Sequence, residues 1–259
     1  MRFLLCLLLF VTIGFSQTKP LIMKHADSLA AMKRSGYLLL KGYVHFVHDS
    51  VQFKTMRATW NRNADIVQCE GDFLFTHPNG FIKAKSGIYQ KRIEFASASG
   101  NVVAKDSLGE YAFFGERLQY DRIKKILTMP LRPVLHHYSK NKDKNGEIDT
   151  LSIKADWISY KQDDEFAEAF KNVVLEHNGM TVTCDTGYFN KKENWISMKG
   201  NPKCLLENHE LSGDSIFLRL TPDGKGLKSA LVIQNAHGIQ KEPRKKRKPG
   251  THTEAFGDT

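Results

Sequence analysis

A glycine recurs at a fixed interval in this chain, and the residues around it alternate in character. Gly42, Gly71 and Gly100 lie 29 residues apart, and Lys171 precedes Gly200 by the same interval. Around each of these positions, every second residue is apolar or small. Such alternation is typical of a β-strand with one buried face. A fixed period predicts that each copy adds the same unit to a stack.

A second column of mostly aromatic residues runs in phase with the first. Its members are separated by 29, 31, 40, 29 and 29 residues. They are Trp60, Tyr89, Tyr120, Tyr160, Phe189 and Leu218. In these strands the apolar positions change parity once, as between Ala155 and Ile158. A change of parity requires a bulge or bend, which we expect at Asp156 and Asp185.

These patterns predict an elongated all-β fold of stacked V-shaped rungs of antiparallel strands. Each repeat is expected to hold one straight strand and one bent strand that passes between two facing sheets. The apolar faces would form a continuous interior. The recurring glycine is expected on the inward face, where a missing side chain allows close backbone approach. Helix is expected only in a short piece near Ala26 to Arg34.

The N-terminus, "MRFLLCLLLFVTIGFSQ", has one arginine, a short apolar stretch and then a small residue. This is typical of a secretory signal peptide spanning 1–16, with cleavage before Gln17. The alternative is a retained N-terminal anchor. The rungs are expected over 17–239, followed over 240–259 by a basic linker. Because "GDT" at the C-terminus resembles "GDS" at Gly213, the sequence stops as a further rung begins, and it is interpreted as a possible fragment.

Charge is unevenly distributed along the chain. The formal net charge is +10, and the run from Lys241 to Lys248 holds six basic residues and one Glu. The excess therefore lies largely in one segment, which favours a solvated linker over a nucleic-acid-binding surface. A polyanion carrying phosphates remains open as a partner.

The motifs of common enzymes and cofactor sites are absent from the sequence: there is no H-E-x-x-H, G-x-S-x-G, Walker loop or Cys-x-x-Cys. We therefore expect no enzyme activity and no cofactor. His136 and His137 are adjacent on a strand and would point to opposite faces, so a shared metal is not favoured. The repeated Asp156, Asp185 and Asp214 favour stabilisation of a bend over calcium binding. The cysteines Cys69, Cys184 and Cys204 fall on inward positions, and a Cys184–Cys204 bond stays open.

The recurrent pattern "A-D-x-x-x-Y … G-N-V" carries a resemblance to a known family. It stands here as Ala155-Asp156 with Tyr160, and as Gly100-Asn101-Val102. From about Ser28 to Leu218, the chain resembles the OstA-like family, which comprises the periplasmic lipopolysaccharide-transport bridge proteins and the N-terminal domain of their outer-membrane partner. The resemblance implies a β-jellyroll or "β-taco" of V-shaped rungs with no catalytic residues. It also implies an apolar groove for lipid A acyl chains and end-to-end association with related domains, including an outer-membrane assembly protein.

The inward positions supply the candidate residues of such a groove. They are Val44, Phe46, Phe73, Phe75, Val102, Val173, Leu175, Tyr89, Tyr160 and Phe189. Small inward residues such as Ala96, Ala98 and Ala167 favour free space in the interior. The main hypothesis is a periplasmic carrier of lipopolysaccharide. The rivals are an exported structural or adhesive β-solenoid with a sealed core, and a β-helix polysaccharide enzyme, for which no recurrent carboxylate cluster is found.

Overall fold

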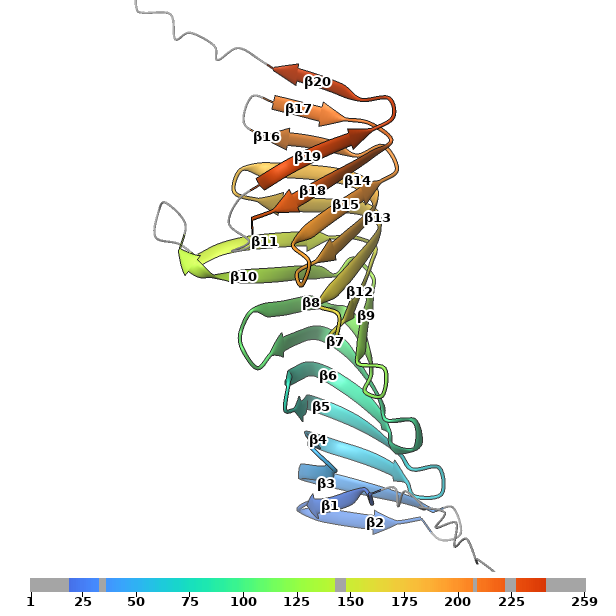
Figure 1. Cartoon of the computed structure of the whole chain (residues 1–259). Coiled ribbons are helices and arrows are strands. Elements are labelled where there is room, and N and C mark those ends of the chain that lie inside the picture. The colour runs from blue at the N-terminus through green and yellow to red at the C-terminus, as the bar shows by residue number, and fades with distance from the viewer. Residues whose placement is uncertain (1–18, 33–35, 143–147, 207–208, 222–226, 241–259) are drawn as a thin grey trace, which may run out of the picture.

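The structure is a computed structural model of the 259-residue chain, and it describes residues 19–32, 36–142, 148–206, 209–221 and 227–240. Antiparallel strands stack into one elongated array (Figure 1). A short 3-10 turn, Lys91–Ile93, connects two of them. The predicted signal peptide, the basic run 241–248 and the C-terminal start of a further rung lie outside the described residues. Those predictions therefore stay predictions.

Each rung of the stack is either one long strand or two short strands placed end to end. The long strands are β3 Tyr37–His48, β4 Val51–Asn61, β5 Ile66–His77, β6 Gly80–Gln90, β7 Phe95–Asp106, β8 Tyr111–Asp121, β13 Phe166–His177 and β14 Met180–Asn190. The split rungs are β1 Ile22–His25 with β2 Ser28–Ala31, β9 Ile126–Pro130 with β10 Val134–Lys142, β11 Ile148–Lys154 with β12 Trp157–Lys161, β15 Trp195–Lys199 with β16 Lys203–Leu206, β17 His209–Ser212 with β18 Ser215–Leu220, and β19 Leu227–Ile233 with β20 His237–Gln240.

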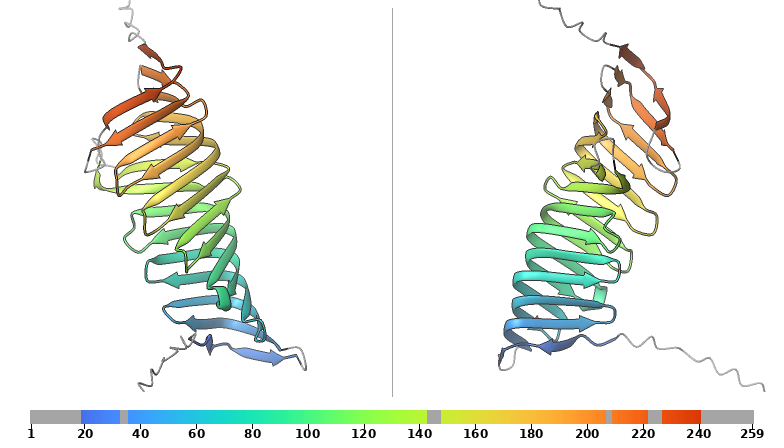
Figure 2. Two further views of the ribbon diagram at one scale, coloured as in Figure 1. Left: turned by 45° about the vertical axis from the view of Figure 1, so that its right-hand side comes forward. Right: turned by 90° about the vertical axis from the view of Figure 1, so that its left-hand side faces the viewer.

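The strand pairing divides the stack into two arms that meet along the line of bends. Arm A contains β1, β10, β11, β16, β17 and β20, and arm B contains β2, β9, β12, β15, β18 and β19. Each long strand contributes one half to each arm, and the rungs are seen to curve in Figure 2. The predicted all-β, elongated fold is confirmed.

The bends are built from two residues on one strand that face one residue on the next. In β5, Gly71 and Asp72 have φ of +77° and +51°. The ladder pairs Glu70 with Ser86 and then Phe73 with Ala84, so Gly71 and Asp72 stand against Lys85 alone. This is a β-bulge. Because two residues of β5 face one residue of β6, the inward positions of β6 change from even to odd numbers across the bulge, whereas those of β5 do not. Both strands of a repeat therefore bend, and the expected straight strand is wrong.

The recurring glycine is required by this backbone conformation. At Gly200, φ is +76°, and an added Cβ would lie 2.4 Å from a carboxylate oxygen of Asp185. Gly42 has φ of +75° and is covered in the same way by Asp27. Glycine adopts positive φ without steric cost, so the period marks the bend and not inward space. Lys171 takes the place of glycine in one rung with φ of +60°.

Aspartates stabilise the bends, as predicted from their repetition. The backbone N–H of Asp156 donates to the carbonyl of Lys171 at 2.9 Å, and the Asn172 side chain donates to the Asp156 carboxylate at 3.0 Å. Asp214 receives a matching bond of 3.0 Å from Asn235. In each case the side chain of one rung holds the left-handed residues of the next.

The helix expected near Ala26 to Arg34 is wrong over the described part of that range. Residues Ser28–Ala31 form β2, which pairs with β3 from Lys41 to Leu38. The edge of β3 offers unpaired N–H and C=O groups, and these ladder bonds outweigh the local helical preference of "LAA".

Candidate functional site: the interior between the arms

All ten predicted groove residues lie on inner faces of the arms and are buried. Their exposed fractions lie between 0 and 7 %, and they belong to one apolar cluster that extends from Leu21 to Leu218. Arm A carries Val44, Phe46, Phe73, Phe75, Val102, Val173 and Leu175, and arm B carries Tyr89, Tyr160 and Phe189. The inward assignment is therefore correct, and around most of these residues the two arms pack directly against each other.

Aromatic rings meet from opposite arms. The ring of Phe75 in arm A lies 5.9 Å from Tyr89 and 6.4 Å from Tyr120 in arm B, measured between centroids. Tyr111 and Tyr160 meet across the arms at 5.1 Å. These pairs draw the arms together, because each ring removes a large apolar area from water.

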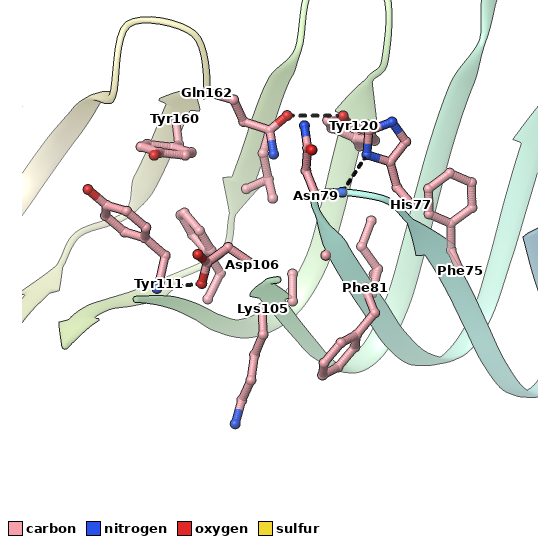
Figure 3. Close-up of a pocket in the computed structure, with 15 residues that line it drawn as sticks. Phe75, His77, Asn79, Phe81, Lys105, Asp106, Tyr111, Tyr120, Tyr160 and Gln162 are labelled. Atoms are coloured by element: carbon pink, nitrogen blue, oxygen red, sulfur yellow. Dashed lines mark hydrogen bonds between the residues drawn. The ribbon is translucent and has the colours of Figure 1, made fainter. Parts of the chain in front are cut away.

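Small inward residues leave little room between the arms. Ala167 and Ala169 border a cavity of only about 10 Å³. Ala104 borders one of about 50 Å³, which Figure 3 shows with Tyr111, Tyr120 and Phe75 around it. A cavity needs roughly 10–15 Å³ of such volume to hold one water, so these spaces admit a few waters at most. The free interior space expected from the small residues is not found at these positions.

The mouth of the V lies opposite the bends, where the hairpin turns of the two arms face each other. Arg122 of arm B donates to Asp49 of arm A at 2.8 Å and to Glu94 at 3.1 Å. Hydrogen bonds from Lys19 and then Arg122 lower the pKa of Asp49 to about 2. The Arg122 side chain is only 14 % exposed, so this ion pair is less screened than one at an open surface.

Beside this ion pair, a histidine and a tyrosine join the two arms. The Nε2 of His48 lies 3.1 Å from the carbonyl of Lys19, so it acts as the donor. Nδ1 of His48 then accepts from the hydroxyl of Tyr89 at 2.5 Å. Burial lowers the pKa of His48 and raises that of Tyr89, so both groups stay neutral near pH 7.

A second ion pair crosses the mouth further along the stack. Lys191, just after β14 in arm B, bonds to the nearly buried Glu110 of arm A. Its ammonium also lies 3.9 Å from Glu165 and 5.3 Å from the ring centroid of Tyr111. The residues of the pair are 81 apart in sequence, and the alternation around the glycines gives no indication of it.

A column of histidines lies at the mouth. Its regular spacing is visible in the sequence, but the ten predicted groove residues do not include it. His48, His77, His137 and His177 each stand six residues after the first residue of a bend. The first three face the aromatic column of arm B, with His77 centred 6.1 Å from Tyr120 and His137 centred 5.9 Å from Phe189, whereas His177 lies beside Asp149. Burial lowers the pKa of His77, and that of His137 to about 4.

The remaining sequence predictions concern the adjacent histidines, metal binding and the cysteines. His136 and His137 point to opposite faces, as predicted, with His136 against Phe114 and His137 against Tyr111. Within the described residues there is no group of three or more His, Cys, Asp or Glu side chains that could hold a metal ion. No helix in the described part of the chain is long and apolar enough to cross a membrane. The three cysteines are buried and free.

Comparisons with known proteins return a structural likeness. No family model matches the chain, and no curated protein matches it. Among solved structures, it is similar to the "Crystal structure of LptH, the LptA homologous periplasmic component of the conserved lipopolysaccharide transport device from Pseudomonas aeruginosa". The identity is 17 % and the TM-score 0.39, with 51 % of this chain and 94 % of that chain covered.

Proposed function

We propose that this chain is an exported, non-enzymatic carrier of lipopolysaccharide, which takes lipid A acyl chains between its two arms and passes them toward the outer membrane. The observation that carries the proposal is the apolar interior closed across its mouth by side chains alone. Among the described strands, every backbone ladder runs within one arm. The arms can therefore separate at the mouth without breaking main-chain hydrogen bonds.

The energetics favour an apolar guest once the mouth is open. Separating the arms exposes inner side chains such as Phe46 and Phe75, which are 0 and 1 % exposed in the closed conformation. An acyl chain that enters covers these faces again and leaves water itself, at roughly 0.8 kcal/mol per methylene. A chain of about 12 carbons gains on the order of 10 kcal/mol from this transfer, before the cost of opening.

Association and location follow from the same proposal. The OstA-like sequence pattern and the predicted signal peptide support a periplasmic location and contact with related domains, including an outer-membrane assembly protein. In the described residues, β1 and β2 pair only with β3 at one end of the stack, and β19 and β20 pair only with β18 and β17 at the other. Such edges can accept a further strand.

Site-specific photo-crosslinking tests the proposal. A photoreactive residue at the inward Phe75 should capture lipopolysaccharide, whereas one at Leu74, which points to the outer face, should not. Phe73→Asp should reduce capture at Phe75, because an unpaired carboxylate between the arms is costly. Equal capture at Leu74 and Phe75, or no capture by the folded protein with lipid present, contradicts the carrier function.

A second candidate is an exported structural or adhesive solenoid with a permanently sealed core. The low exposure of all ten groove residues favours it. The two functions differ in whether the mouth opens, so absence of capture at Phe75 in the folded protein would support the sealed core.

A further inference from the structure

One part of the interior between the arms is hollow. A cavity of about 220 Å³ lies between arm A and arm B, among β11, β14, β15 and β18. Its apolar wall includes Leu151, Met180, Phe189, Ile196 and Leu220. An engineered cavity of 150 Å³ with such a lining binds benzene. This cavity is therefore large enough for a short length of aliphatic chain, unlike the spaces of about 10 and 50 Å³ elsewhere between the arms.

The charged groups on the polar wall of the cavity lie close to groups of opposite charge. Nε2 of His177 lies 2.9 Å from Oδ1 of Asp149, although the alignment is not that of a hydrogen bond, and Lys191 is held by Glu110 and Glu165. A ligand with a strong charge would have to displace these partners. An uncharged aliphatic chain can occupy the apolar wall and leave them in place.

The two ends of the cavity differ in how tightly the arms are joined. Toward β8, Lys191 and Glu110 join the arms, and Tyr111 and Tyr160 pack behind them. Toward the C-terminal end the mouth is looser: Leu206 stands at the same place in its rung as His48, yet it is 36 % exposed and His48 only 3 %. A chain in the cavity can therefore extend toward the C-terminal rungs, whereas the ion pair blocks it toward the N-terminal half.

We propose that this cavity is a seat of a lipid aliphatic chain, and that the Lys191–Glu110 pair is a clasp that separates it from the sealed N-terminal half. This inference rests on the proposed carrier function and adds where a chain is held and what separates it from the N-terminal rungs. It requires no recognition of the headgroup charge at the cavity itself.

Binding of 12-carbon probes tests the seat. Dodecyl phosphate and dodecyl maltoside share a chain but differ in headgroup charge, and both should bind the full chain. Met180→Trp fills the cavity and should weaken both by at least tenfold. Leu205→Trp is the matched control, since Leu205 is 41 % exposed on β16, and it should bind as the parent does. Leu220→Trp fills the same cavity from arm B and replaces Met180→Trp if circular dichroism shows that variant unfolded.

Lipid capture in the sealed half tests the clasp. The double variant Lys191→Met with Glu110→Gln removes both charges with little change in size. Capture of lipopolysaccharide by a photoreactive residue at Phe75 should rise several-fold. Lys125→Met is the control, because its ion pair with Asp163 at 2.8 Å is exposed and lies within arm B. Unchanged capture in the double variant would show that the pair is not a barrier.

The outcomes distinguish failure of the seat from failure of the carrier function. If lipopolysaccharide reaches Phe75 but the dodecyl probes bind Met180→Trp as well as the parent, the seat is wrong and the carrier function stands. Binding of dodecyl phosphate without dodecyl maltoside would also overturn the seat, because the headgroup would then decide binding. If neither probe binds and Phe75 captures nothing, the carrier function itself fails.

Discussion

Acidification should destabilise the fold through His137, and replacing this residue should reduce that sensitivity. The imidazole lies on the inner face of β10, with ring centroids of Tyr111 at 4.9 Å and Phe189 at 5.9 Å. Burial is the main cause that lowers its pKa to about 4, and the positive charge of Lys191 adds to it. His137→Phe keeps a ring of similar size among these neighbours and cannot be protonated.

The magnitude follows from the difference between folded and unfolded pKa values. An unfolded histidine has a pKa near 6.5, so between pH 6.5 and 4 the unfolded chain binds more protons at this position than the folded chain does. The stability that neutral His137 permits is therefore fully present above pH 6.5 and is lost as the pH falls. The loss amounts to about 2 kcal/mol at pH 5 and about 3 kcal/mol at pH 4.

Urea unfolding followed by circular dichroism measures this effect at pH 7 and pH 5. With an m value of about 2 kcal/mol per molar, the variant should gain about 1 M in midpoint relative to the parent on going from pH 7 to pH 5. Other histidines with lowered pKa values, such as His48 and His77, are common to both proteins and cancel in this difference. His209→Phe is the control, because His209 is exposed on β17 and should give no such gain.

An equal difference between variant and parent at both pH values would refute the reasoning. It would mean that water reaches His137 in the folded protein, and hence that the arms stand apart in solution at this level of the stack.

Three further predictions concern the bends, the thiols and the basic run. Gly109→Ala should lower the free energy of unfolding by about 1 kcal/mol, because the residue has positive φ. Gly200→Ala should lower it further, since Gly200 has positive φ and also has Asp185 against it. Equal midpoints of urea unfolding for the two variants would show that the Asp185 side chain moves aside at no cost. Labelling of Cys69, Cys184 and Cys204 with a maleimide should be slow until urea unfolds the chain, because burial raises the pKa of all three thiols, that of Cys184 to about 11; rapid labelling of the native protein would contradict their placement. Deleting Lys241 to Lys248 should leave the β signal in circular dichroism unchanged, because the run interrupts the period, and loss of that signal would make it part of a rung.

Periodicity alone predicted which residues face inward and how the rungs stack. Alternation indicates directly which face of the strand a side chain is on, so the inward facing of the ten candidates and of Cys69 was predicted correctly; whether the ten form a groove stays a prediction. It does not report backbone dihedral angles, and so the role of Gly42 and Gly71 was misassigned: a residue every 29 positions looks the same whether it sits at a bend or on an inner face.

Separation between the arms could not be predicted in this way. Facing residues such as Phe75 and Tyr89 can line an open trough or touch, and the pattern is identical in both cases. The ion pairs across the mouth could not be predicted from the sequence either. Arg122 and Asp49 are 73 residues apart, and only the curvature of the stacked rungs brings them together. The histidine column could have been predicted from the sequence, because His48 and His77 are separated by the same 29 residues as the glycines.

The restriction of backbone ladders to each arm makes the stiffness of this molecule directional. A force along the stack acts on rows of main-chain hydrogen bonds in both arms at once, whereas a force that parts the arms meets only side-chain contacts such as Tyr111 with Tyr160 and Lys191 with Glu110. Thermal motion will therefore be largest as a breathing of the mouth about the line of bends. The pairs of left-handed residues, such as Gly71 with Asp72, lie on the axis of that hinge.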